Sequence, residues 1–172
     1  MRTILSRQDI LHLIQQKPAL VEGYLKLEDQ VQPNGFDLTL RDVAALQSGG
    51  VVAVSNAQRQ ISNLQTLAFG KDDYWDLSPG SYLITYNEIV NLPKNVMALG
   101  APRSSLLRCG VTVHMAVWDA GYSGRSQSLL VVYNPLGFRV QRNARVAQLV
   151  FMELAAETEG YQGVYQGENI SG

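Results

Sequence analysis

Apolar positions follow the pattern of short β-strands over most of the chain. They alternate with polar positions in residues 82–86 and 111–117, which is the period of a strand with one buried face. Residues 129–133 and 146–152 are more continuously apolar, so these two segments are predicted to be strands buried on both faces.

Turn-forming residues separate these runs at short intervals. Clusters containing glycine, proline or asparagine occupy residues 32–35, 48–50, 78–80, 92–95 and 134–137. Many short strands with regular turns between them favour a β-sandwich or a β-barrel. The chain is therefore predicted to be mainly β.

The N-terminal residues carry a helical signal. Ser6 and Asp9 have the spacing of a capping box, and apolar residues follow at helical spacing in residues 10–14. Pro18 disfavours helical backbone at the residue before it. A short helix is therefore predicted within residues 1–18.

Two segments are harder to interpret. Residues 58–64 are compatible with a loop, a helical turn or an irregular strand. Residues 160–172 are rich in glycine, glutamine and tyrosine, and they are predicted to form a mobile C-terminal tail. A length of 172 residues is typical of one domain, so a single domain is predicted over residues 1–172.

Composition excludes several classes of partner and site. With 14 basic and 15 acidic residues the net charge is −1, so no overall positive field favours nucleic acid or a membrane surface. A single cysteine excludes an intrachain disulfide and a cysteine-rich zinc site, and two distant histidines exclude a multi-histidine metal site. No signal peptide or membrane span is recognisable, so we expect a cytoplasmic protein.

Residues 102–108 (PRSSLLR) are a candidate phosphate site. Arg103 and Arg108 flank the hydroxyl groups of Ser104 and Ser105. Guanidinium groups, hydroxyls and backbone amides are all donors that suit a phosphate chain. The alternative is a capped helical turn with solvated arginines, which composition alone favours.

Residues 117–124 (VWDAGYSG) are a candidate catalytic segment. Asp119 follows a predicted strand, and a carboxylate at a rigid strand end can orient a water molecule and accept its proton. Tyr122 offers a flat ring for a sugar or a base. The alternative is that aspartate and glycine are here only as turn residues. In residues 34–38 (NGFDL), Asp37 could receive a metal-bound water or merely terminate a turn.

Four segments, in this order, resemble the motifs of the superfamily of trimeric deoxyuridine triphosphatases and dCTP deaminases. Residues 34–38, 102–106 and 117–124 are similar to its first three motifs, and residues 143–149 (NARVAQL) to its fourth. The similarity spans about residues 32–152. It implies a distorted jelly roll, or β-clip barrel, with a short N-terminal helix. It also implies a homotrimer with sites between the subunits.

The resemblance implies hydrolysis of dUTP to dUMP and pyrophosphate. Asp119 would activate the water that attacks the α-phosphorus. Mg²⁺ on the triphosphate would neutralise charge, with Asp37 as an outer-shell ligand through water. The substrate-binding residues that the resemblance implies are Arg103, Ser104, Ser105, Arg108, Tyr122, Gln148, Tyr161, Tyr165 and Gln166. The last three would form a tail that closes over the substrate.

Two alternatives to this activity remain open. The dCTP deaminases use a glutamate on the strand after the third motif, and its place here falls on or near Val132. No acidic residue lies between Asp119 and Asn134, so the chain resembles archaeal-type triphosphatases more than a dCTP deaminase, whether monofunctional or bifunctional. The other alternative is a non-catalytic module that binds deoxynucleotides and regulates a partner.

Overall fold

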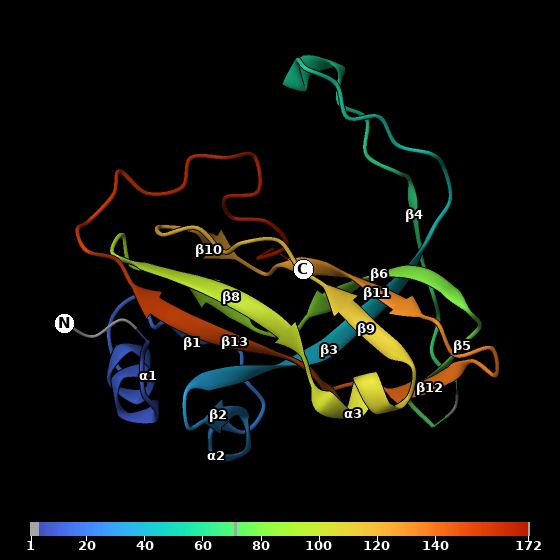
Figure 1. The fold of residues 1–172 in the computed structure, drawn as a ribbon, viewed down its shortest axis with the longest axis horizontal. Coiled ribbons are helices and arrows are strands. Elements are labelled where there is room, and N and C mark those ends of the chain that lie inside the picture. The colour runs from blue at the N-terminus through green and yellow to red at the C-terminus, as the bar shows by residue number, and fades with distance from the viewer. Residues whose placement is uncertain (1–3, 71, 172) are drawn as a thin grey trace.

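The computed structural model describes residues 4–70 and 72–171. The protein is mainly β and its central sheet forms a nearly closed barrel (Figure 1), which confirms the predicted fold class. No helix in these residues is long and apolar enough to cross a membrane.

The elements are short and follow one another closely. The helices are α1 (Arg7–Ile14), α2 (Leu27–Gln30), the 3₁₀ turn η1 (Asn56–Gln58) and α3 (Ser104–Arg108). The strands are β1 (Val21–Glu22), β2 (Val31–Gln32), β3 (Gly35–Leu46), β4 (Leu64–Thr66), β5 (Tyr74–Leu77), β6 (Gly80–Tyr86), β7 (Ile89–Asn91), β8 (Val96–Pro102), β9 (Val111–His114), β10 (Ser123–Gly124), β11 (Gln127–Val132), β12 (Phe138–Gln141) and β13 (Arg145–Glu153).

The main sheet has the antiparallel order β8-β13-β3-β6-β11-β9, and contacts between β8 and β9 bring its two ends together. Strand β3 joins the two halves, because its first part pairs with β13 and its second part with β6. The partner changes near Leu40, where the register with β6 is irregular. Two small sheets, β1-β7-β10 and β12-β5, lie outside this path.

Two predicted strands are present, but the prediction that they are buried on both faces is wrong. In β11, Leu130 and Val132 are buried while Leu129 and Val131 are only half-buried, and β13 alternates in a similar way. One face of each strand fills the barrel, whereas the outer face has only partial cover. An apolar outer face therefore did not indicate complete burial.

The strand predicted at residues 111–117 is shorter than its alternating pattern. Strand β9 ends at His114, and Val117 is half exposed. The chain then leaves β11, and Trp118 forms an isolated bridge with Ala98 of β8. The alternation thus continues past the end of β9, up to the residue before the chain pairs with β8.

The predicted N-terminal helix is confirmed as α1. The Ser6 side chain accepts a hydrogen bond from the Asp9 amide, and the Asp9 carboxylate accepts one from the Ser6 amide. Ile10 and Ile14 are buried, and α1 contacts β2 and β3. The helix is shorter than the interval 1–18, of which residues 1–3 lie outside the described part.

Residues 47–63 protrude from the barrel between β3 and β4, and we call them the arm (Figure 1). The backbones of Val51 and Gln60 hydrogen-bond in both directions, at 2.7 and 2.9 Å, so the two branches of the arm lie side by side. The ambiguous residues 58–64 are thus mostly loop, between η1 and the first residue of β4.

Candidate functional site

Three of the four motifs meet beside the C-terminal end of β8. Asp37 on β3 lies opposite Gln148 on β13, so their side chains share one face of the sheet. The Gln148 Nε2 atom donates to Asp37 Oδ1 at 3.3 Å. Arg103, just after β8, and Arg145, at the start of β13, each place Nη1 at 3.4 Å from Asp37 Oδ2. We call these four residues the arginine cluster.

Asp37 is the buried centre of the arginine cluster. Its side chain is 1% exposed, whereas those of Arg103 and Arg145 are 31% and 36% exposed. Burial raises the pKa of the Asp37 carboxyl above its ordinary value, and the two guanidinium groups oppose that rise. Two cations around one carboxylate leave positive charge at the surface. The cluster is therefore suited to bind an anion.

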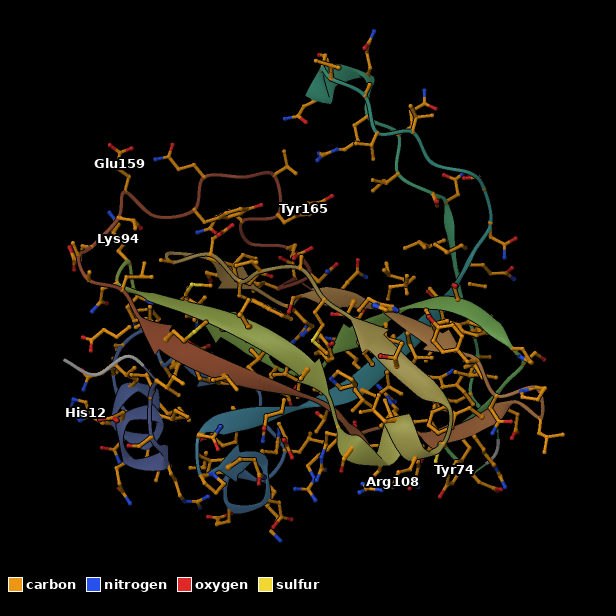
Figure 2. The ribbon with its side chains drawn as sticks, viewed as in Figure 1. His12, Tyr74, Lys94, Arg108, Glu159 and Tyr165 are labelled. Atoms are coloured by element: carbon orange, nitrogen blue, oxygen red, sulfur yellow. The ribbon has the colours of Figure 1, made fainter. Side chains whose placement is uncertain are left out.

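The neighbouring helix α3 separates the other predicted phosphate ligands into two groups. Ser104 and Ser105 begin α3 directly after Arg103, and both are exposed. Arg108 ends the helix, and its Nη1 atom lies 3.5 Å from the carbonyl oxygen of Ser104 rather than beside Asp37. Figure 2 shows Arg108 at the outer side of α3. The two serines thus directly follow Arg103 of the arginine cluster, whereas Arg108 lies at the other end of α3.

The third motif lines a separate cavity of about 620 Å³. Its walls come from three parts of the chain: the barrel and third motif, the arm, and the C-terminal residues. The candidate residues that line it are Asp119, Tyr122, Tyr161 and Tyr165. We call this space the motif-three cavity.

Asp119 lies at the edge of the motif-three cavity. The backbone of Trp118 exchanges hydrogen bonds of 2.9 and 3.1 Å with Ala98, which holds the next residue at the end of a short β pairing. Asp119 is exposed, and no described residue hydrogen-bonds or ion-pairs with its carboxylate. It also borders a second hollow of about 440 Å³, which Tyr122 and Tyr165 do not line. We therefore take the motif-three cavity as the candidate site.

Tyr122 connects the third motif to the C-terminal residues. Its hydroxyl donates to Glu168 Oε1 at 2.8 Å, and its ring packs edge-on against Tyr161 with centroids 5.8 Å apart. Burial, followed by the bond to Glu168, raises the pKa of the Tyr122 phenol. The Tyr122 phenol therefore stays neutral near pH 7. Its ring contributes an aromatic surface to the cavity.

Residues 160–171, which we call the tail, are docked on the third motif. The amides of Tyr161 and Gly167 donate to the carbonyls of Ala120 and Ser123, both at 2.8 Å. The Gln166 side chain accepts from the Ser123 amide and donates to the Gly121 carbonyl, both at 3.1 Å. Tyr161 and Tyr165 line the cavity, whereas Gln166 fastens the tail to the loop.

The arginine cluster and the third motif, which lines the motif-three cavity, adjoin β8 at different positions along the strand. Trp118 pairs with Ala98, whereas Arg103 follows the last residue of the strand. Five residues of extended chain span roughly 16 Å. No residue of the arginine cluster lines the cavity, so one chain presents the two parts of the predicted site separately.

Sequence reasoning did not assign roles to three charged residues. Arg145 lies inside the fourth motif, so its position in that motif could have indicated a binding role. Glu168 in the tail and Arg59 in the arm both line the cavity. Neither residue belongs to a motif or a periodic pattern. Only the folding of the chain brings them beside the third motif, so no local sequence signal marks them.

The described residues contain no group of three or more histidine, cysteine, aspartate or glutamate side chains placed to hold a metal ion. Asp37, the predicted outer-shell ligand, has its carboxylate between Arg103 and Arg145. A metal held mainly by protein side chains does not fit this part of the chain, whereas a metal held by substrate oxygens and water needs no such group.

The fold defines a barrel protein of the dCTP deaminase type. The crystal structure of 2'-deoxycytidine 5'-triphosphate deaminase from Agrobacterium tumefaciens is similar to it, with a TM-score of 0.68 and 23% identity. The match covers 88% of this chain and 49% of that chain, so this chain spans about half of that protein.

The family follows from the sequence comparison. The dCTP deaminase-like family matches residues 4–154, and the chain belongs to this family. It is 49% identical over 168 residues to a probable deoxyuridine 5'-triphosphate nucleotidohydrolase of Methanosarcina barkeri, covering 97% of this chain and 98% of the relative. It is 36% identical over 141 residues to the deoxyuridine 5'-triphosphate nucleotidohydrolase of Methanocaldococcus jannaschii, covering 81% and 89%.

Proposed function

We propose that this protein is a dUTP diphosphatase, which hydrolyses dUTP to dUMP and pyrophosphate. The observation that carries the proposal is the exposed Asp119 carboxylate, without a described protein partner, at the edge of an aromatic-lined cavity. The names of relatives that match nearly the whole chain support the same activity.

In this proposal Asp119 orients a water molecule and takes its proton as the water attacks the α-phosphorus. The bond from that phosphorus to the bridging oxygen breaks, and pyrophosphate leaves. Positioning a general base contributes about 10²–10⁴-fold to such a reaction. Tyr122 packs against the deoxyribose, and the arginine cluster holds the negatively charged phosphates.

We propose that Mg²⁺ enters with the triphosphate rather than as a resident metal. The lack of a three-ligand group in the described chain favours this arrangement. Bound to the phosphate oxygens, Mg²⁺ would supply charge neutralisation. The outer-shell role of Asp37 stays a prediction, and its contacts with Arg103 and Arg145 give it a second role in positioning those arginines.

We further propose a homotrimer in which each site combines the motif-three cavity of one subunit with the arginine cluster of another. The separation of these two parts along β8 supports the proposal, because Asp119 and the phosphate donors must reach the same triphosphate. A closed cyclic assembly repeats one such interface around its axis.

The second candidate is dCTP deamination, and the observation in its favour is Glu168. This tail residue lines the motif-three cavity, and burial raises the pKa of its carboxyl, a property shared by general acids. Against it, the position near Val132, where the deaminases place their glutamate, is an apolar buried part of β11. A third candidate, the regulatory nucleotide-binding module, predicts binding without turnover.

The experiment is a paired assay of dUTP and dCTP, with and without Mg²⁺, that measures both pyrophosphate and ammonia. We expect Mg²⁺-dependent pyrophosphate release from dUTP, no ammonia from dCTP, and a loss of about 10²–10⁴-fold in Asp119→Asn because an amide cannot take the proton. Asp76→Asn is the matched control, since Asp76 is exposed on β5 and pairs with Arg139 away from the cavity.

Each other outcome selects a different function. Ammonia release from dCTP establishes the deaminase. Tight dUTP binding with no turnover by the wild type establishes the regulatory module. Full activity of Asp119→Asn overturns the proposed mechanism.

A further inference from the structure

The arm forms one wall of the motif-three cavity. The wall comprises Gly50, Val51, Val52, Arg59, Gln60, Ile61 and Ser62. Val52 and Ile61 are 92% and 69% exposed, so they contribute little to the core of the barrel. They line the motif-three cavity instead, so the arm forms a wall of the same cavity as Asp119.

Arg59 is the residue of this wall that is suited to bind an anionic ligand. Among the described residues that line the cavity it is the only one with a full positive charge, while Asp119 and Glu168 are both acidic. Its guanidinium carbon lies 5.7 Å from the centroid of the Tyr165 ring. A cation over an aromatic face keeps its N–H donors free for an anion, and no ion pair of Arg59 with a described residue is present.

We propose that Arg59 binds the phosphate chain of the nucleotide in this cavity, so that the arm supplies a phosphate contact that the four motifs do not contain. This inference rests on the proposed function. Water activated by Asp119 must meet a phosphorus atom near two carboxylates, both of which repel phosphate oxygens. An arginine in the same cavity offsets that repulsion and offers a two-pronged hydrogen bond.

Tyr165 sets the position of Arg59 in this arrangement. The tail carries Tyr165, and Figure 2 shows this residue on the side of the tail toward the arm. The ring and the guanidinium therefore join the arm to the docked tail. Arg59 and the tail then close over the same nucleotide from two sides.

A role in phosphate binding and a purely structural role in holding Tyr165 have different consequences. A phosphate contact loses more affinity as the nucleotide gains phosphates. A structural contact changes the affinity for every nucleotide by the same factor, because the base and sugar are common to all of them.

The experiment compares binding of dUMP, dUDP and the slowly hydrolysed analogue dUpNHpp by calorimetry, with Mg²⁺ present. For Arg59→Ala we expect a loss of about tenfold to a hundredfold for the analogue, from one charged hydrogen-bonding partner, and a much smaller loss for dUMP. Arg59→Lys should recover part of the loss, because it keeps the charge without the planar fork. Gln58→Ala is the control, since Gln58 is exposed in η1 of the same arm and does not line the cavity.

Equal losses for dUMP and the analogue, or no loss at all, overturn the inference. Pyrophosphate release by the wild type is measured alongside and tests the proposed function separately. If the wild type binds the analogue without hydrolysing dUTP, the hydrolase proposal fails while a phosphate-dependent loss in Arg59→Ala still supports the contact. If the wild type binds no nucleotide, both are overturned.

Discussion

The arginine cluster and the motif-three cavity are built in different ways. Asp37 and Gln148 face each other across paired strands, and the two arginines follow or begin strands of the same sheet. The cavity instead lies where the third-motif loop, the arm and the tail meet beside the barrel. The sheet thus preorganises one part, whereas the second part depends on segments that pack against its surface.

This difference predicts how changes in each part act. A substitution in the arginine cluster alters both stability and phosphate binding, because the same carboxylate is buried in the fold and holds the arginines. A substitution at an exposed residue of the cavity, such as Asp119, alters activity and leaves the barrel intact.

The largest expected effect comes from combining defects of the two parts. Asp119→Asn and Arg103→Ala are each expected to have little activity alone. In a mixed trimer, a site that joins the cavity of one subunit to the cluster of another can be intact. Equal random mixing should restore about a quarter of wild-type activity, measured as pyrophosphate release after the two proteins are refolded together. The absence of recovery contradicts a site shared between subunits.

The next prediction compares how a substitution in each part changes the free energy of unfolding. Asp37→Asn is expected to lower the free energy of unfolding by about 1–3 kcal/mol, because the two guanidinium groups lose their shared acceptor and meet the donors of an amide. Part of this loss is offset, since burial of the Asp37 carboxylate is itself unfavourable. Asp119→Asn, at an exposed position, should change the free energy of unfolding little. Urea unfolding measures both, and equal changes contradict the contrast.

The two parts also differ in how well the sequence predicts them. Asp37, Arg103 and Gln148 lie in local motifs on or beside strands, so their order along the chain indicated a shared site. The capping box at Ser6 was equally local. Arg59 and Glu168 could not be found in this way, because their place beside Asp119 depends on how the arm and the tail fold back. The outer faces of β11 and β13 were misjudged for a related reason: cover from distant segments decides burial.

A steric change tests the docking of the tail. Gly121 has a φ of +83°, and a Cβ atom there would lie 2.6 Å from the Cα of Gly160. Gly121→Ala should therefore displace the tail and cost about 1 kcal/mol or more in backbone strain. Faster proteolysis of residues 160–171, with the barrel intact, is the expected measurement. Gly49→Ala is the control, since an added Cβ meets nothing there within 4 Å; equal proteolysis of the two variants contradicts the docking role.

The smallest expected effect is a pH dependence of the same docking. Burial raises the pKa of the Glu168 carboxyl above its ordinary value of 4.5, so the docked tail binds this proton more tightly than a free tail does. Docking is therefore strongest below the ordinary value and weakens as the pH rises through the raised value. Anisotropy of a fluorophore on Ser171→Cys, in a Cys109→Ser background, should fall over that interval.

Glu168→Gln isolates the charge from the hydrogen bond in this measurement. The amide oxygen of glutamine can still accept from the Tyr122 hydroxyl, which lies 2.8 Å from Glu168 Oε1, but it does not ionise. The variant should therefore keep the tail docked across the interval and flatten the pH dependence. Tyr122→Phe removes the donor and should weaken docking at every pH. An unchanged pH dependence in Glu168→Gln would assign the response to another group, and the tail would then be fastened mainly by Gln166 and the backbone bonds of Tyr161 and Gly167.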